Sequence, residues 1–354
     1  MDVNRARTAF GRCRPWQELV RICLSQLDGL AGNANAGIVF MADPTGEMVD
    51  DILFHLKAET GIERWIGAAG RGVISGANEA FDEPGLALML ARWPDSDIRL
   101  IETGGVIPED RDGLALLHLA SDTRFDPLPR GAVGGRVSTV FDGTEIAGVA
   151  TAGGCSGLWF GPQIAHATAI LRGGRANGPW RRVSSAIGGR ILLIDDRSAA
   201  DAVAADAGEL LARAPERLIR SIMIETCSGE EEPGVSGRPL RIEQFSRASG
   251  EVLVQSQRPG NWLRVTNRNP AIALEEIDSA VRELLDSFPG GRMPRAAILY
   301  GSVDRGHALF GPAVSEASRV QAALGSVPLI GLRTSEELHG GELACGTAVL
   351  ALIG

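Results

Sequence analysis

The chain has 354 residues, of which 44% are hydrophobic and 22% are charged, and its formal net charge is −9. This length and composition are typical of a globular protein with a substantial core, built as two domains or one large two-lobed domain. The negative charge, without any block of Lys or Arg, argues against a nucleic-acid partner. Because no apolar stretch of about 18 residues and no signal-peptide pattern occurs, we expect a cytoplasmic protein with no membrane partner.

Cysteine and histidine spacing gives no sign of a metal site. The five cysteines form no C-x-x-C pair, which is typical of reduced thiols in a reducing compartment. The five histidines show no H-E-x-x-H or similar spacing. We therefore predict no metal and no cofactor, and we assign no catalytic residue.

Apolar spacing predicts alternating helices and strands from the N-terminus onward. Residues 15–27 have the spacing of an amphipathic helix, and residues 48–60 form a second helix after a turn at 43–46. The short apolar runs at 38–41 and 86–90 are typical of strands covered on both faces.

The middle of the chain offers further strands and a domain boundary. Strands are predicted at residues 112–119, 136–141 and 187–194, and Asp142-Gly143 is a strong hairpin signal because a type I′ turn needs positive φ angles. An alanine-rich helix over 196–214 ends near Pro215. We place the boundary there, between a lobe of residues 1–215 and a lobe of residues 216–354.

The C-terminal lobe continues through residues 218–225 and a polar loop at 227–237 to a strand pair at 240–245 and 251–254, followed by a helix at 270–288. The strand, helix and strand order of residues 37–93 then recurs in residues 297–353, where a helix predicted at 314–324 matches the helix 48–60 and Ile330-Gly331 matches Ile66-Gly67. We predict an α/β protein of two related lobes, each a mixed sheet covered by helices, that arose by internal duplication. The alternative is that any chain of alternating helices and strands offers two such units.

The two recurring regions together resemble the FIST family, a sensory module with N and C parts. The segments that carry the resemblance are ETGIERWIGAAGRGVI and FDEPGLALML in the N part, and DRGHALFG and LGSVPLIGLRTSEEL in the C part. The resemblance implies a small-ligand sensor that acts on a downstream signalling protein in trans.

The chain departs from the family at two positions that often carry cysteine, where it has Ala68 and Ser302. Haem binding has been attributed to some family members, and a haem-based gas sensor is one alternative function. Haem needs an axial ligand in an apolar pocket, whereas His307 and His339 stand among charged residues and glycines. We therefore expect no haem.

Charged residues follow several strands, at the edge where sheets commonly present ligands. Arg305 and His307 follow one strand, Arg333 and Glu337 follow the next, and Arg71 lies at the corresponding place in the N-terminal lobe. If the lobes face each other, the arginines converge on a cleft suited to an amino-acid-like or carboxylate metabolite, because Arg pairs with carboxylate and Glu with ammonium. We expect replacement of Arg305 or Arg333 to lower affinity with little effect on the melting temperature. The alternative is that these are solvated loop residues.

The glycine-rich segment TAGGCSGLWF, residues 151–160, is a second candidate region. Backbone N–H groups around Gly153, Gly154 and Ser156 are candidates to line the same cleft, although tight hairpin packing explains them equally. The segment matches neither the P-loop nor the G-x-S-x-G motif. We predict a binding protein that does no chemistry; the alternative is an enzyme acting at this loop, where Cys155 and His166 resemble a thiol–base pair in composition only.

Overall fold

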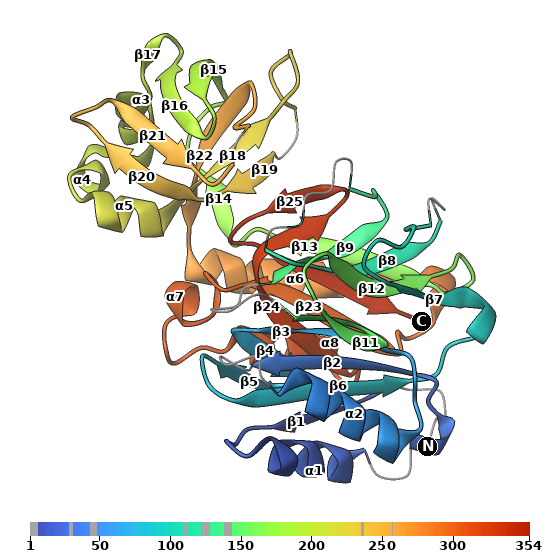
Figure 1. The fold of residues 1–354 in the computed structure, drawn as a ribbon. Helices are drawn as coiled ribbons and strands as arrows, with labels where there is room; N and C mark the ends of the chain where they lie inside the picture. The colour runs from blue at the N-terminus through green and yellow to red at the C-terminus, as the bar shows by residue number, and fades with distance from the viewer. Residues whose placement is uncertain are drawn as a thin grey trace. The chain divides into compact units, whose positions relative to one another are not determined.

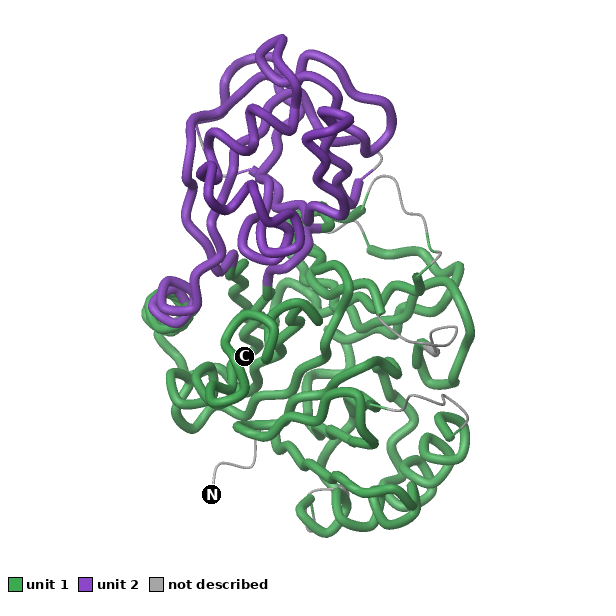
Figure 2. Tube along the Cα trace, turned by 90° about the vertical axis from the view of Figure 1, so that its left-hand side faces the viewer, with its two compact units in different colours: residues 1–171, 277–343, 348–354 green, residues 172–276, 344–347 purple. Residues whose placement is uncertain are grey.

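The computed structural model describes residues 6–27, 31–42, 48–108, 112–121, 123, 128–137, 144–234, 237–256 and 258–354. Over these ranges the chain is a strand-rich mixed α/β protein with three mixed or antiparallel sheets (Figure 1). The chain forms two compact units (Figure 2). Unit 1 comprises residues 1–171, 277–343 and 348–354, and unit 2 comprises 172–276 and 344–347. The boundary predicted after residue 215 falls inside unit 2, in α5 (Pro215–Ser221).

The first sheet of unit 1 has the strand order β1-β6-β2-β3-β10-β11. β2 and β3 are parallel, whereas β6 runs antiparallel to both β2 and β1. Helices α1 and α2 cover one face of this sheet and share a core with its strands (Figure 1). The bounds are β1 (Arg7–Gly11), α1 (Trp16–Gln26), β2 (Ala36–Ala42), α2 (Val49–Thr60), β3 (Trp65–Gly70), β6 (Gly85–Ala91), β10 (Thr144–Ala147) and β11 (Val149–Ala152).

The second sheet of unit 1 follows the order β13-β26-β23-β24-β9-β8-β12-β7, and β4, β5 and β25 join it at β24. β23 and β24 are parallel, and β26 runs antiparallel to both β23 and β13. The bounds are β4 (Gly72–Ser75), β5 (Asn78–Phe81), β7 (Ile98–Ile101), β8 (Leu114–Leu119), β9 (Ala132–Val137), β12 (Cys155–Phe160), β13 (His166–Leu171), β23 (Ala296–Ser302), β24 (Leu329–His339), β25 (Glu342–Ala344) and β26 (Ala348–Ile353).

Four strands of the two sheets share one order and one set of directions, β1-β6-β2-β3 and β13-β26-β23-β24. Val39 lies opposite Gly67 in the first, and Leu299 lies opposite Gly331 in the second. A Cβ atom on Gly67 would stand 1.7 Å from the Val39 carbonyl oxygen, and one on Gly331 would stand 2.5 Å from the Leu299 carbonyl oxygen. Each glycine therefore permits a close backbone approach. Both sheets belong to unit 1, rather than to separate lobes.

The two sheets of unit 1 share a core. Ile38 and Phe40 from β2 belong to one buried cluster with Ile298 and Tyr300 from β23. The rings of Phe40 and Tyr300 meet edge to face with their centroids 6.1 Å apart. The alternate residues of β2, such as Val39, instead contact α1 and α2 in a second cluster. Both faces of β2 are therefore buried, as its continuous apolar run predicts.

Unit 2 contains the third sheet, in the order β19-β18-β22-β15-β16-β21-β20 with β14 and β17 at its sides. Helices α3, α4 and α5 contribute to its apolar core. The bounds are β14 (Gly174–Ala176), β15 (Arg181–Ile187), β16 (Arg190–Ile194), β17 (Arg197–Ser198), α3 (Ala199–Ala207), α4 (Glu209–Ala212), β18 (Ile222–Cys227), β19 (Arg238–Leu240), β20 (Ile242–Ser246), β21 (Glu251–Val254) and β22 (Trp262–Arg268). Along the sequence, the main segment of unit 2 lies between β13 and the middle of α6 (Pro270–Asp286).

Some local predictions need correction. The helix predicted over 196–214 begins only at α3, where the Ser198 side chain caps it by accepting from the Asp201 N–H, and it breaks at Gly208, whose φ is 99°. Residues 187–194 are not one strand: Ile187 ends β15, residues 188 and 189 form a turn, and residues 190–194 form β16. The helices predicted at 15–27, 48–60, 270–288 and 314–324 are confirmed as α1, α2, α6 and α8 (Glu316–Leu324). The turn at 43–46, the turn Asp142-Gly143 and residues 138–141 lie outside the described residues.

Candidate functional site

Arg333 and Arg305 are positioned by strands β24 and β23. Arg333 lies on β24 opposite Gly301 of β23. A Cβ atom on Gly301 would stand 2.8 Å from Nη1 of Arg333, so the missing side chain leaves the space that this guanidinium occupies. Arg305 follows the end of β23 and precedes the short helix α7 (Gly306–Phe310). Both residues therefore lie near the carboxyl end of β23, where sheets commonly present ligand sites.

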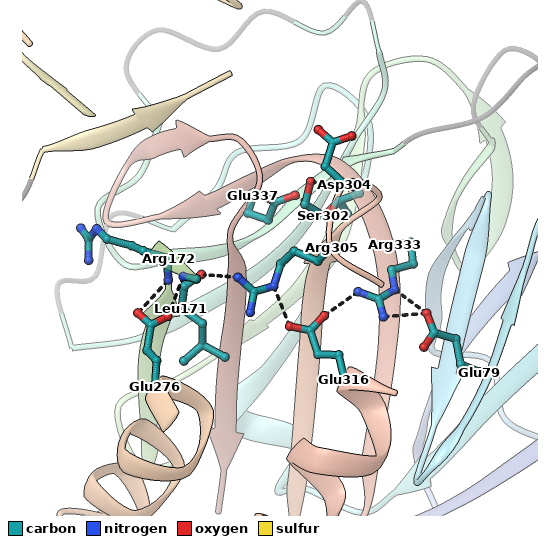
Figure 3. Close-up of polar contacts among 12 residues, drawn as sticks. Glu79, Leu171, Arg172, Glu276, Ser302, Asp304, Arg305, Glu316, Arg333 and Glu337 are labelled. Atoms are coloured by element: carbon teal, nitrogen blue, oxygen red, sulfur yellow. Dashed lines mark hydrogen bonds and ion pairs between the residues drawn. The ribbon is translucent and has the colours of Figure 1, made fainter. Parts of the chain in front are cut away.

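Glu316, the first residue of α8, joins the two arginines (Figure 3). Nε of Arg305 donates to Oε1 of Glu316, and Nη1 of Arg333 donates to Oε2, each at 2.6 Å. Nη1 of Arg305 also donates to the Leu171 carbonyl oxygen at 3.2 Å. Arg333 reaches further to Glu79 of β5: its Nε donates to Oε1 at 2.7 Å, and its Nη2 lies 2.6 Å from the same oxygen. We call Arg305, Glu316, Arg333 and Glu79 the ion-pair network.

Burial makes this network unusual. The side chains of Arg305 and Glu316 are 0% exposed and that of Arg333 is 1% exposed, whereas that of Glu79 is 20% exposed. Burial raises the pKa of the Glu316 carboxyl, but the charges of Arg305 and Arg333 outweigh it and hold this pKa below its usual value. Burial lowers the pKa of Arg333, but Glu316 and Glu79 raise it above its usual value. The shifts of Glu316 and Arg333 both favour the charged forms, so this buried pair is an ion pair.

A cavity of about 460 Å³ lies at the more exposed end of the network, where Glu79 and Arg333 form part of its wall. A volume of this size suits a small molecule. Arg12 and Glu83 also line it and form an ion pair of 3.2 Å, with side chains 58% and 39% exposed. The remaining lining residues are Ala77, Asn78, Phe81, Val303, Gly306, His307, Ala308 and Ser315. The cavity thus combines apolar walls with charged groups of both signs.

The structure brings some of the predicted site residues together. Arg305 and Arg333 bind one carboxylate, and Arg333 and His307 line the cavity. Both arginines are buried, so the alternative of solvated loop residues is wrong for them. Arg71 instead forms a partly exposed ion pair with Asp82, and its guanidinium lies 5.0 Å from the centre of the Phe81 ring, outside the cavity lining. Glu337 is buried and accepts a hydrogen bond from Thr334 Oγ1 at 2.9 Å.

The glycine-rich segment runs from the end of β11 in the first sheet into β12 in the second sheet. Gly153 and Gly154 connect β11 to β12, and β12 is separated from β24 by β8 and β9, which amounts to about 14 Å at the usual strand spacing. The carbonyl oxygens of Gly153 and Gly154 accept hydrogen bonds from Thr103 and Thr123. Gly153, Gly154 and Ser156 do not line the cavity.

Ser156 belongs to a buried polar chain that sequence reasoning missed. Its Oγ lies 3.3 Å from the Gly67 carbonyl oxygen and 3.4 Å from Nδ1 of His118, whose Nε2 lies 3.0 Å from the Tyr300 hydroxyl. One hydrogen arrangement satisfies every contact: Tyr300 donates to His118, His118 to Ser156, and Ser156 to Gly67. Burial lowers the pKa of His118 to about 3 and raises that of Tyr300 above its usual value. These groups are therefore neutral.

The thiol of Cys155 has the properties of a core residue. Burial, together with the charge of Glu145, raises the pKa of this thiol to about 11. The thiolate is the nucleophilic form, so a thiol with this pKa is a poor nucleophile near neutral pH. Nδ1 of His166 donates a hydrogen bond of 3.1 Å to the Ile164 carbonyl oxygen.

Sequence reasoning also missed Glu79 and Glu316, the acidic half of the ion-pair network. Glu316 follows Ser315, whose side chain caps α8 by accepting from the Ser318 N–H. That pattern also describes an ordinary solvent-exposed helix start, at which acidic residues are common. Glu79 lies on β5, the second strand of the β4–β5 hairpin that follows Arg71 in the sequence. Its partner Arg333 is 254 residues away. Neither local pattern signals an ion pair.

Comparison of the sequence with models of known protein families found no match, and comparison with curated proteins found no similar protein. Among the described residues, no cluster of three or more His, Cys, Asp or Glu side chains could hold a metal ion. None of the helices in the described part of the chain has the length and apolar character needed to cross a membrane.

Proposed function

We propose that this protein is a small-ligand sensor of the FIST type, which binds an amino-acid-like or carboxylate metabolite without turning it over. The observation that carries the proposal is the cavity of about 460 Å³ with the Arg333–Glu79 ion pair in its wall. Concave sites with apolar walls and a few placed polar groups are the usual form of small-molecule sites. Groups of both charges beside apolar surface suit a molecule that is itself charged and partly apolar.

The proposal assigns the binding role to the cavity and its lining residues rather than to the glycine-rich segment. The buried, neutral state of Ser156, His118 and Cys155 favours binding over catalysis at that segment. We propose that a cytoplasmic signalling protein reads the bound state in trans, as the FIST resemblance implies.

We further propose that unit 1 contains an internal duplication. The common order of β1-β6-β2-β3 and β13-β26-β23-β24 supports it, as do the matched glycines Gly67 and Gly331 opposite Val39 and Leu299. In this proposal β13 corresponds to β1, and α6 corresponds to α1. Most of unit 2 is then an insertion between β13 and α6. One rigid superposition of the two four-strand sets should align Gly67 with Gly331; an alignment displaced by one or more residues would contradict the duplication.

The ligand-binding proposal is tested by thermal-shift and native mass spectrometry with a panel of amino acids, amines and carboxylates. We expect at least one compound to raise the melting temperature and to be retained at one molecule per chain. Ala308→Trp should abolish the shift, because Ala308 is exposed and lines the cavity. Ala205→Trp is the matched control, because Ala205 is exposed on α3 and does not line the cavity.

Four outcomes would contradict the proposal. The first is a panel in which no compound binds, and the second is a ligand whose binding survives Ala308→Trp unchanged. Turnover of a bound compound would instead favour an enzyme. A Soret band in the purified protein that disappears on replacement of His307 or His339 would favour a haem sensor.

A further inference from the structure

The two oxygens of Glu79 have different surroundings. Oε1 accepts from Nε of Arg333 and lies 2.6 Å from its Nη2, whereas no described residue donates a hydrogen bond to Oε2. Glu79 lines the cavity, and its side chain is more exposed than any other in the ion-pair network. The cavity wall therefore contains a carboxylate oxygen that remains able to accept a hydrogen bond.

Arg333, by contrast, already lies against two carboxylates, those of Glu79 and Glu316. Its Nε donates to Glu79 and its Nη1 donates to Glu316, while its buried Nη2 lies 2.6 Å from Glu79 but forms no hydrogen bond. A ligand carboxylate would therefore have to reach a buried guanidinium that already lies against two carboxylates. Removing a charge from its partner in such a buried setting is costly, so Arg333 is poorly placed to receive an anionic ligand.

Space is available beside Glu79. A Cβ atom on Gly306 would stand 3.9 Å from Oε1 of Glu79 and 3.9 Å from Nη2 of Arg333, so glycine keeps this part of the cavity open. Nearer the surface, Glu83 is the only residue of the described ranges that pairs with Arg12, whose side chain is 58% exposed. An exposed pair of this kind is weak and is easily exchanged for a ligand group.

We infer that the ligand carries a protonated amine and that Glu79 is the specificity-determining residue that binds it. This inference rests on the proposed small-ligand function and deepens it. An ammonium donates charge-assisted hydrogen bonds to a carboxylate oxygen such as Oε2 of Glu79. Where the ligand also has a carboxylate, Arg12 at the exposed side of the cavity receives it. A carboxylate with no amine leaves Oε2 of Glu79 without a donor, brings a second negative charge close to it and is disfavoured.

The test compares each of two amino acids with the compound that lacks its α-carboxylate and the compound that lacks its amine. One set is L-leucine, 3-methylbutylamine and 4-methylpentanoate; the other is L-glutamate, 4-aminobutyrate and glutarate. Isothermal titration calorimetry measures the Kd of each for the wild-type chain and for Glu79→Gln, which keeps the side-chain size and removes the charge. We expect the amine-bearing members of at least one set to bind ten times or more tightly than its amine-free member. Glu79→Gln should remove this preference.

Glu336→Gln is the matched control variant. Glu336 is also paired with an arginine, Arg136, at 2.6 Å, and its side chain is 18% exposed, but it does not line the cavity. This control should keep the wild-type affinities. Circular dichroism and a melting curve show whether Glu79→Gln folds. If it does not, the Kd values of the six compounds for the wild-type chain still test whether the site prefers an amine.

The possible failures separate the two proposals. If an amine-free acid binds the wild-type chain as tightly as its amine-bearing partners, or if Glu79→Gln leaves the amine preference intact, the role of Glu79 is refuted and the cavity remains a ligand site. If none of the six compounds and no member of the wider panel binds, the proposed function fails together with this inference.

Discussion

Arg305 and Arg333 each donate a hydrogen bond of 2.6 Å to one carboxylate, that of Glu316, and all three side chains are buried. The sequence led us to expect that replacing either arginine would leave the melting temperature nearly unchanged. The structure reverses that expectation. An arginine that balances a buried carboxylate supports the fold itself, so its removal affects stability before it affects any ligand.

We predict that Arg305→Ala lowers the free energy of unfolding by roughly 3–5 kcal/mol, because it leaves Glu316 with one guanidinium instead of two in a buried setting. Urea unfolding followed by circular dichroism measures the change. Arg71→Ala is the control, since the partly exposed Arg71–Asp82 pair should contribute only about 0–1 kcal/mol. Equal losses in the two variants would contradict a special role for the buried network.

Gly301→Ala should also destabilise the protein. Its Cβ atom would stand 2.8 Å from Nη1 of Arg333, so the guanidinium would have to move away from Glu316. Overpacking of this kind typically costs about 1–3 kcal/mol. In Gly32→Ala the new Cβ atom meets no atom within 4 Å, so this control should unfold like the wild type. A wild-type melting temperature for Gly301→Ala would mean that Arg333 does not need this space.

The stability of the protein should fall in acid partly because of His118. Burial lowers the pKa of this histidine to about 3, below its ordinary value of 6.5, so the unfolded chain binds the proton more readily than the folded chain. The contribution of His118 is therefore fully present above about pH 6.5 and is lost as the pH falls towards 3. Urea unfolding at a series of pH values should give a shallower acid slope for His118→Gln than for the wild type.

His55→Gln is the control for that experiment, because His55 is exposed and contacts Trp16 at the ring edge. It should keep the wild-type slope between pH 6.5 and 3. If His118→Gln and the wild type lose stability in parallel over this window, the neutral hydrogen-bonded state of His118 is not a source of the pH dependence.

Thiol labelling should separate the cysteines by burial. Burial raises the pKa of Cys155 to about 11 and that of Cys23 to about 12, with smaller contributions from Glu145 and Cys13 respectively, so both thiols are protonated and covered near neutral pH. We expect a disulfide-exchange reagent at pH 7.5 to modify the partly exposed Cys13 and Cys227 in the folded protein. Cys155 should react only after unfolding. Reaction of Cys155 at the rate of Cys13 would favour the enzyme alternative. The Cys155→Ser variant shows which part of the labelling comes from Cys155, because that part is lost in the variant.

Local sequence patterns were sufficient for the elements whose apolar residues repeat with a clear period. The helices α1, α2 and α6 were predicted within a few residues, because each buries one apolar face and the spacing of that face is a local property. The same reasoning failed over residues 196–214. There, Gly208 and the Ser198 cap divide an alanine-rich segment whose composition alone favours one helix.

The sequence by itself determined that this is a mixed α/β protein and that Arg305 and His307 follow the strand β23. It placed Arg333 and Glu337 after the next strand, whereas both lie within β24. Only the tertiary structure decided their partners. Glu79 meets Arg333 because the β4–β5 hairpin joins the second sheet at β24, a pairing between segments more than 250 residues apart. Glu316 turns inward because two guanidinium groups balance its charge, whereas Arg71 pairs at the surface. Burial and pairing of charges depend on long-range packing, which no local spacing encodes.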